Sequence, residues 1–246
     1  MSQLVRLLRS AGRATGRPTA GFGARQENGR KRLILVAALD DASADKARKA
    51  VAAGADLVEV TGQHGSKALD QLKALVAEVD APIGVAFDGR VPADFDFKAF
   101  EAAANVDYVK VEAGDVPASV FLLEGPAVVL EVKETFTDTM LKMLNFLPAK
   151  VIQVDSPDKI QEFTVKQLME KRVDRELIGK PLLMKVGPGI KPDAAQLLNL
   201  VAPNGLVVPA ADVAAWKEAL ADLKEPADDD DEMSAGLRVH VQATAS

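Results

Sequence analysis

Lysine and acidic residues recur near the ends of short apolar segments from the middle of the chain onwards. Lys110 lies in Tyr-Val-Lys-Val-Glu, Glu131 and Lys133 lie in Leu-Glu-Val-Lys, and Asp155 and Lys185 close two later segments. Carboxylates and amines that lie close together can transfer protons, and an amine that loses its proton easily can attack a carbonyl carbon. These five residues are the candidate catalytic groups, with Lys185 the first choice as nucleophile.

A second group of polar residues lies near the ends of similar segments and could bind a substrate: Glu59, Asp88, Glu112, Gln153 and His64. His64 follows one segment in Thr-Gly-Gln-His-Gly-Ser, where an imidazole can change its charge near neutral pH, although a solvated surface histidine is the alternative. Magnesium binds carboxylates, so Asp40, Glu59, Asp88, Glu112 and Asp155 are candidate ligands. They show no recognisable spacing, and no cofactor is required.

The segments that carry these residues alternate with stretches of helical periodicity. This alternation is typical of β/α units with parallel strands. We expect eight strands, at residues 33–40, 56–61, 83–88, 108–113, 127–133, 151–155, 182–186 and 206–208. We expect helices between and after them, at 43–53, 66–79, 95–104, 117–123, 137–147, 159–171, 192–200 and 213–223.

Eight parallel units can close into a (β/α)8 barrel of the TIM type, an α/β fold that leaves no sheet edge unpaired. A doubly wound open sheet is the alternative. That fold usually carries Gly-x-Gly-x-x-Gly after its first strand, whereas this sequence runs Ala-Leu-Asp-Asp-Ala at residues 38–42. The sequence therefore favours the barrel.

Alternation along each expected strand separates the side chains of the lumen from those that face the helices. If the apolar positions face the helices, Lys110, Glu131, Gln153 and Lys185 point into the lumen at similar height. Active sites of this fold lie at the C-terminal ends of the strands, where these residues cluster. The alternative is a set of ion pairs that satisfy one another near water at the barrel mouth.

Residues 183–193 read Leu-Met-Lys-Val-Gly-Pro-Gly-Ile-Lys-Pro-Asp. This segment resembles the lysine and glycine-rich turn of class I aldolases of the deoxyribose-phosphate type, and the turn after strand seven of phosphate-binding barrels. The resemblance implies Schiff-base chemistry, and a substrate phosphate held by the backbone of Gly187 and Gly189. The sequence departs from the pattern after the expected eighth strand, where residues 207–213 contain no glycine, and on the sixth, which has Gln153 and Asp155 where the aldolases have their lysine.

The two ends of the chain differ from its middle. Residues 1–31 contain seven arginines and lysines and one acid, which predicts a flexible basic arm. A transit peptide, or a contact with a second copy of the chain in a homo-oligomer, would also fit. Residues 226–246 begin with an acidic run and predict a disordered tail. The barrel is expected over residues 32–225.

Composition limits the function classes. The chain has 246 residues, no cysteine and a formal net charge of −6, so we expect no disulfide, no thiolate site and no nucleic-acid partner. No apolar run is long enough to span a membrane, which favours a cytoplasmic protein, with organellar import as the alternative. The leading hypothesis is a lyase or isomerase acting on a small carbonyl compound, with or without a phosphate. The alternative is a non-catalytic binding or scaffold barrel that acts through its charged termini.

Overall fold

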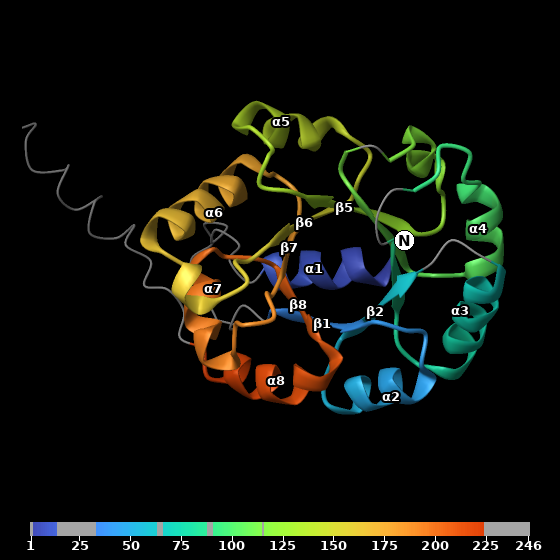
Figure 1. The fold of residues 1–246 in the computed structure, drawn as a ribbon, viewed down its shortest axis with the longest axis horizontal. Helices are drawn as coiled ribbons and strands as arrows, with labels where there is room; N and C mark the ends of the chain where they lie inside the picture. Colours follow the sequence, from blue (N-terminus) through green and yellow to red (C-terminus); the bar gives the residue numbers. More distant parts are fainter. Residues whose placement is uncertain (1, 14–32, 63–65, 88–90, 115, 224–246) are drawn as a thin grey trace, which may run out of the picture.

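The computed structural model describes residues 2–13, 33–62, 66–87, 91–114 and 116–223. Its eight strands are all parallel and pair in sequence order, and β8 pairs with β1 to close a barrel (Figure 1). The prediction of a (β/α)8 barrel is confirmed. The strands are β1 (Ile34–Leu39), β2 (Leu57–Gly62), β3 (Ile83–Phe87), β4 (Tyr108–Glu112), β5 (Ala127–Val132), β6 (Val151–Asp155), β7 (Leu182–Lys185) and β8 (Gly205–Pro209).

Helices cover the outside of the barrel, one after most strands (Figure 1). The predicted helix after β4 is reduced to a 3-10 turn, and further 3-10 turns stand beside α5, α6, α7 and α8. The elements are α2 (Ala44–Ala52), α3 (Ser66–Glu78), α4 (Phe97–Ala104), η1 (Ala118–Leu122), α5 (Asp138–Met143), η2 (Leu144–Phe146), η3 (Ile160–Glu162), α6 (Val165–Leu177), η4 (Pro192–Ala194), α7 (Ala195–Leu200), η5 (Ala210–Asp212) and α8 (Val213–Ala221).

Helix α6 begins six residues later than the predicted start at residue 159. The hydroxyl of Thr164 accepts a hydrogen bond from the backbone N–H of Gln167, and the side chain of Gln167 accepts one from the backbone N–H of Thr164. This reciprocal capping box satisfies two backbone donors and fixes where the helix starts. The Thr-x-x-Gln spacing was present in the sequence, but the periodicity alone placed the start too early.

The barrel has two separate apolar layers, as the alternation of side chains predicted. Val109, Val111, Leu130 and Val154 face outward and belong to the large core between strands and helices. The second layer fills the N-terminal half of the lumen and consists of Ile34, Val36, Leu57, Tyr108, Ala127, Val129, Val151, Leu183 and Val207 together with part of a further helix.

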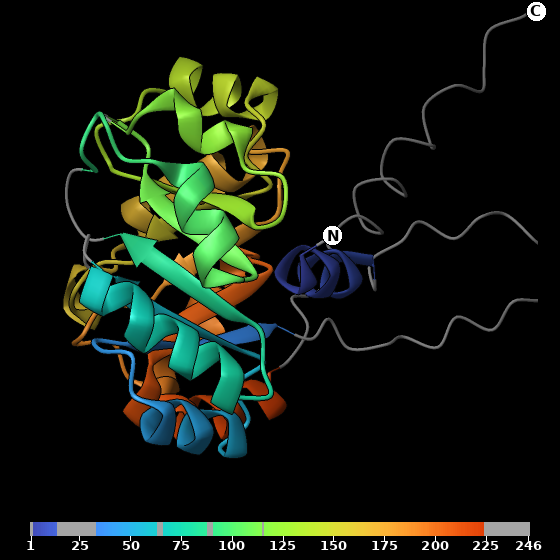
Figure 2. The same cartoon turned by 90° about the vertical axis from the view of Figure 1, so that its right-hand side faces the viewer.

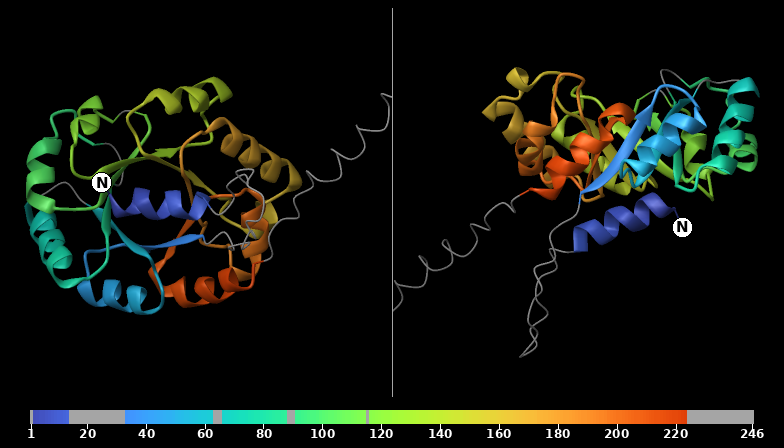
Figure 3. Two further views of the ribbon diagram at one scale, coloured as in Figure 1. Left: turned by 180° about the vertical axis from the view of Figure 1, so that it is seen from behind. Right: turned by 90° about the horizontal axis from the view of Figure 1, so that it is seen from below.

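That further helix, α1 (Gln3–Arg13), lies across the N-terminal end of the barrel (Figures 2 and 3). Leu4 and Leu8 are each 0% exposed and pack with Val5 and Ala11 onto the lumen floor. The prediction of a flexible arm is therefore wrong for these residues. Leucines one turn apart form an apolar face, and the barrel offers that face an apolar floor, while Arg6 and Arg9 remain exposed.

A carboxylate from the barrel caps the start of α1. Asp107, immediately before β4, accepts hydrogen bonds from the Ser2 hydroxyl (2.8 Å), the Gln3 backbone N–H (2.6 Å) and the Leu4 backbone N–H (2.8 Å). The first N–H groups of a helix lack partners within the helix and favour a negative charge. Asp107 thus fixes the helix at one end and the leucines fix it along its length.

Other predictions about the termini fall on residues that the structure does not describe. These are residues 14–32 of the basic segment and residues 224–246, which include the acidic run. Among the described helices, none combines the length and the apolar character needed to cross a membrane.

Candidate active site

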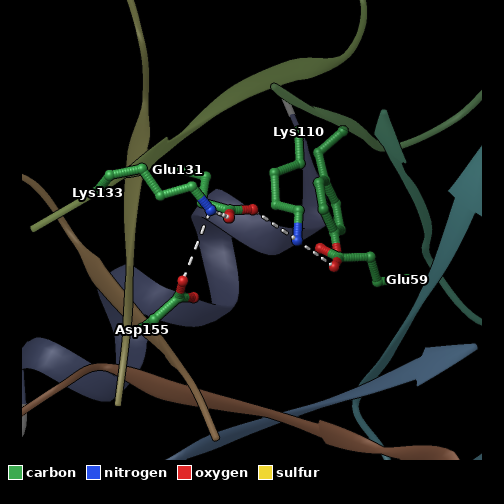
Figure 4. A network of polar contacts seen from close by, with 6 residues as sticks. Glu59, Lys110, Glu131, Lys133 and Asp155 are labelled. Atoms are coloured by element: carbon green, nitrogen blue, oxygen red, sulfur yellow. Dashed lines mark hydrogen bonds and ion pairs between the residues drawn. The ribbon is translucent and has the colours of Figure 1, made fainter. Parts of the chain in front are cut away.

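A chain of alternating charges lies in the lumen above the apolar floor (Figure 4). The Lys110 ammonium lies at its centre, donating a hydrogen bond to Glu59 Oε1 at 2.7 Å and pairing with Glu131 Oε2 at 3.3 Å. All three side chains are largely buried, and that of Lys110 is only 6% exposed. The Tyr108 hydroxyl donates a further hydrogen bond to Glu59 Oε2 at 3.1 Å.

The chain of charges continues towards solvent through Lys133. Its ammonium donates a hydrogen bond to Glu131 Oε1 and lies 3.7 Å from Asp155 Oδ2. The side chains of Lys133 and Asp155 are 39% and 36% exposed, so they can contact a molecule that enters from solvent. The buried Glu59–Lys110–Glu131 part therefore lies behind an accessible lysine–carboxylate pair.

The residues of the network come from four strands: Glu59 from β2, Lys110 from β4, Glu131 from β5 and Asp155 from β6. In the strand register Glu131 lies beside Gln153 on β6, and Asp155 lies beside Lys185 on β7. The lumen-facing positions alternate along each strand, so Lys133 and Asp155 lie one layer above Glu131 and Gln153. The sequence analysis correctly placed these side chains in the lumen, although it did not predict which would pair.

The pKa values of the two lysines of the network are raised, which favours their protonated form. Burial disfavours the charged form of Lys110, but the charges and hydrogen bonds of Glu59 and Glu131 outweigh it and raise the pKa of the ammonium. Burial also opposes the charge of Lys133, but the hydrogen bond to Glu131 and the charges of Glu131, Asp155 and Glu112 raise its pKa. An amine loses its proton easily when other positive charges crowd it. Lys110 and Lys133 instead lie between carboxylates, which gives neither of them a reason to be a neutral nucleophile.

The carboxylate between the two lysines is held in its ionised form. Burial favours the neutral acid at Glu131, but the hydrogen bond from Lys133 and the charges of Lys110, Lys133 and Lys185 outweigh it and lower the pKa of the carboxyl group. Burial and the adjacent Glu59 charge raise the pKa of Tyr108 well above its ordinary value, so its hydroxyl remains a donor.

These shifts predict a loss of stability at both ends of the pH scale. Because the pKa of Glu131 is lower in the folded state, its contribution is complete above the ordinary value of about 4.3 and is lost as pH falls through the folded-state pKa. The raised pKa values of Lys110 and Lys133 give a contribution that is complete below about 10.4 and is lost as pH rises through theirs. Urea unfolding over a pH series measures both arms. Glu131→Gln should flatten the acid arm, and an unchanged acid arm in that variant would contradict the assignment.

Among the described residues, lumen-facing side chains are exposed at the C-terminal end of the barrel, while α1 covers the N-terminal end. Thr61, Glu112 and Lys185 are exposed there, and Ala38, on the lumen face of β1, is partly exposed. The small residues Gly84 and Ala86 on β3 are expected to leave room in the lumen, but the space at Gly84 is filled by the Tyr108 ring, which would lie 2.0 Å from an added Cβ atom. The opening is therefore above the charged network, on the side where active sites of this fold lie.

Two features of β7 and the turn after it differ from the sequence-based interpretation. Lys185 does not lie deep in the barrel but is exposed at its rim. The backbone N–H of Gly187 donates to the Ser156 hydroxyl at 2.8 Å, and that of Gly189 donates to the Asp158 carbonyl at 2.7 Å. A Cβ atom at Gly187 would lie 2.3 Å from the Pro157 carbonyl oxygen. The glycines thus allow close packing of the turn against the β6 loop, and these two amides already have partners.

The magnesium hypothesis gains no support from the geometry. Within the described ranges, no group of three or more acidic or histidine side chains could hold a metal ion. Glu59 and Asp155 contact lysines instead, and Glu112 is exposed at the end of β4. His64 and Asp88 lie outside the described residues.

A cavity of about 650 Å³ lies apart from the charged network. Its wall includes Val60, Val85, Phe87 and Phe100, and the first three project from the outer face of the barrel towards the helices. It borders the gaps in the description at residues 63–65 and 88–90. We place the candidate active site at the network because the groups able to transfer protons gather there.

Tyr108 contributes to the site although it was not among the candidate residues. Its hydroxyl donates a hydrogen bond to Glu59, and its ring fills the space beside β3. A tyrosine at the start of a strand, two positions before an inward lysine, is the signal that could have indicated it, since buried tyrosines usually bind a partner through the hydroxyl.

No protein-family model and no curated protein matches the sequence. Solved structures match its architecture. Thiamine phosphate pyrophosphorylase from Pyrococcus furiosus aligns with a TM-score of 0.58 and 16% identity, covering 77% of this chain and 96% of that one. N-(5'-phosphoribosyl)anthranilate isomerase from the same organism aligns with a TM-score of 0.60 and 13% identity, covering 78% of this chain and 100% of that one.

A third structure is 3-keto-L-gulonate-6-phosphate decarboxylase from Vibrio cholerae, with a TM-score of 0.57 and 16% identity over 78% of this chain and 99% of that one. The chain shares their fold. At these identities the likeness concerns the barrel architecture alone, and the chemistry has to be argued from the side chains of this chain.

Proposed function

We propose that the chain is a lyase or isomerase that moves a proton beside the carbonyl group of a small metabolite. The observation that carries this proposal is the accessible Lys133–Asp155 pair backed by the buried Glu59–Lys110–Glu131 chain. A protonated lysine next to a carboxylate supplies the two groups that enolisation needs, a positive charge for the carbonyl oxygen and a base for the adjacent carbon.

In the proposed reaction Asp155 takes the proton from the carbon beside the carbonyl group. The electron pair of the C–H bond forms the new C=C bond, and the carbonyl oxygen becomes an oxyanion stabilised by the Lys133 ammonium. If the carbon that lost the proton carries a hydroxyl group, that hydroxyl becomes the new carbonyl group, its proton moves to the oxyanion, and return of the carbon-bound proton to the former carbonyl carbon completes an isomerisation. If the next carbon carries a leaving group such as phosphate, re-forming the carbonyl group shifts the C=C bond and expels that group with the electron pair of its C–O bond, and the enzyme is a lyase. Glu131 and Lys110 position Lys133 and hold it in its charged form.

Lys185 is proposed to bind an anionic group of the substrate. It is exposed at the rim and lies beside Asp155 in the strand register. The neighbours in fold include proteins named for phosphate-bearing compounds, which supports a phosphorylated substrate. The earlier hypothesis of a Schiff base at Lys185 is a second mechanism that the same position allows, and trapping with borohydride tests it.

The test is solvent exchange. In D2O the wild-type protein should exchange a carbon-bound proton of at least one compound from a panel of glycolaldehyde, dihydroxyacetone, glyceraldehyde and their phosphates. Proton NMR measures the loss of the proton signal. Asp155→Asn should slow the exchange by on the order of a hundredfold, and Lys133→Met should do the same. Lys166→Met, on the exposed face of α6, is the matched control and should leave the rate unchanged.

Three outcomes would contradict the proposal. Exchange that persists in Asp155→Asn would show that another group takes the proton. Failure of the wild type to exchange or to be stabilised by any compound would favour the non-catalytic binding barrel. A borohydride-stable adduct on Lys185 would replace proton transfer from Asp155 with the Schiff-base mechanism.

A further inference from the structure

The side chain of Gln153 is buried in the lumen without a hydrogen bond. Gln153 is 0% exposed, and neither its Nε2 nor its Oε1 atom has a partner in the described part of the protein. Asp155, two residues along the same face of β6, has a buried Oδ1 atom in the same condition. Buried polar atoms are nearly always paired in folded proteins, with ordered water or a ligand where no protein group is available.

The side chains beside Gln153 do not supply the missing bonds. In the strand register its neighbours are Glu131 and Leu183. Both oxygens of Glu131 pair with Lys110 and Lys133, the Gln153 amide makes no hydrogen bond to them, and Leu183 is apolar. An additional, small polar group in the lumen would satisfy the amide of Gln153.

The chemistry of the three unpaired atoms selects the kind of group. Nε2 needs an acceptor, while Oε1 and an ionised Asp155 Oδ1 need donors. A metal cation would leave Nε2 unsatisfied, and an anion would be repelled by Asp155. A hydroxyl group both donates and accepts, so it can accept from Nε2 and donate to one of the two oxygens, and a water molecule can donate to both. The Cα atoms of residues two apart in a strand are separated by about 6.6 Å, whereas one oxygen with two hydrogen bonds of about 2.9 Å spans at most about 5.8 Å, so the side chains of Gln153 and Asp155 incline towards each other when one oxygen binds both.

We infer that Gln153 and Asp155 form a hydroxyl-binding subsite in the lumen, occupied by a water molecule in the free protein and by a substrate hydroxyl in the complex. The second half of this inference rests on the proposed function, because Asp155 is also the proposed base. It makes the substrate a hydroxycarbonyl compound, with one hydroxyl held between Gln153 and the reacting carbon, and it disfavours simple aldehydes and ketones.

A high-resolution crystal structure of the free wild-type protein tests the first half without any turnover. Electron density for a water molecule within hydrogen-bond distance of the Gln153 amide and Asp155 Oδ1 is the expected result. A dry lumen at this position, or a Gln153 amide bonded to a protein group, would overturn the inference.

Ligand binding tests the second half, with hydroxyacetone and acetone as probes because they differ by the one hydroxyl group that the subsite would hold. Wild-type protein should bind hydroxyacetone roughly tenfold more tightly, as expected for one hydrogen bond. Gln153→Met, which keeps the length of the side chain and removes the amide, should lose that preference. Leu183→Met, the control on the neighbouring strand, should keep it. Equal binding of the two probes by wild type, or a preference that survives in Gln153→Met, would refute the substrate half.

Failure of this inference can be told apart from failure of the proposed function. Asp155→Asn retains an oxygen that accepts a hydrogen bond, so it should still prefer hydroxyacetone to acetone while losing proton exchange. Exchange without any hydroxyl preference would remove the subsite and leave the proposed chemistry. A hydroxyl preference without exchange would leave the subsite and remove the proposed chemistry.

Discussion

Replacing Lys110 by methionine is expected to lower the free energy of unfolding by about 3–5 kcal/mol, the cost typical of breaking a buried ion pair. The ammonium lies between Glu59 and Glu131, whose side chains are only 4% and 13% exposed. Methionine fills much of the same volume but leaves two buried carboxylates facing each other. Urea unfolding at neutral pH, followed by circular dichroism, measures the change.

The control is Lys166→Met on α6, where the Lys166–Glu170 pair spans 3.7 Å on an exposed surface. Exposed pairs contribute between about 0 and 1 kcal/mol, so this variant should unfold almost as the wild type does. Replacing Glu59, Lys110 and Glu131 together by apolar residues should recover much of the loss, since the desolvated charges are then gone. If Lys110→Met cost no more than Lys166→Met, the two acids would not be ionised and buried as described.

Replacing Leu8 by alanine is expected to cost about 2–5 kcal/mol, as for other fully buried leucines. Leu8 is 0% exposed and packs with Leu4 against the lumen floor. The lost side chain would leave a cavity beneath the barrel, and undocking of α1 would expose the apolar floor to water. Thermal unfolding measures the stability, and increased binding of a hydrophobic dye would report an exposed floor.

Arg9→Ala is the matched control on the same helix, because the Arg9 side chain is exposed. It should change the free energy of unfolding by less than about 0.5 kcal/mol. Equal stability of Leu8→Ala and Arg9→Ala would mean that α1 does not pack on the barrel in solution. A large loss in Leu8→Ala alone would establish α1 as part of the folded domain.

The architecture could be predicted from the sequence because its signals repeat. Eight apolar segments, each followed by a helical or turn-like stretch, indicate the barrel, and the alternation within Tyr108–Glu112 and Ala127–Val132 separates lumen from outer face. Helix α1 was missed because its basic residues were more conspicuous than the spacing of Leu4 and Leu8. The floor that orders the helix is assembled from many strands, and no local signal reveals it.

The sequence predicted which charged side chains face the lumen, but not which of them form ion pairs with one another. Alternation placed Lys110, Glu131 and Lys133 in the lumen, and each was found there. The sequence did not show that Lys110 and Lys133 lie between carboxylates, whose charges raise the pKa of both ammonium groups. Such contacts depend on strand register and on rotamers, and a shift of register by one residue reverses which side chains meet.

Helix α1 has a consequence for how the chain acquires its structure during synthesis. The helix precedes every strand in the sequence, yet its docking surface includes Val36 from β1, Leu183 from β7 and Val207 from β8. Contacts across such sequence separations form late. Leu4 and Leu8 therefore emerge from the ribosome long before their partners exist, and they remain open to chaperones and to other nascent chains until the eighth strand has closed the barrel.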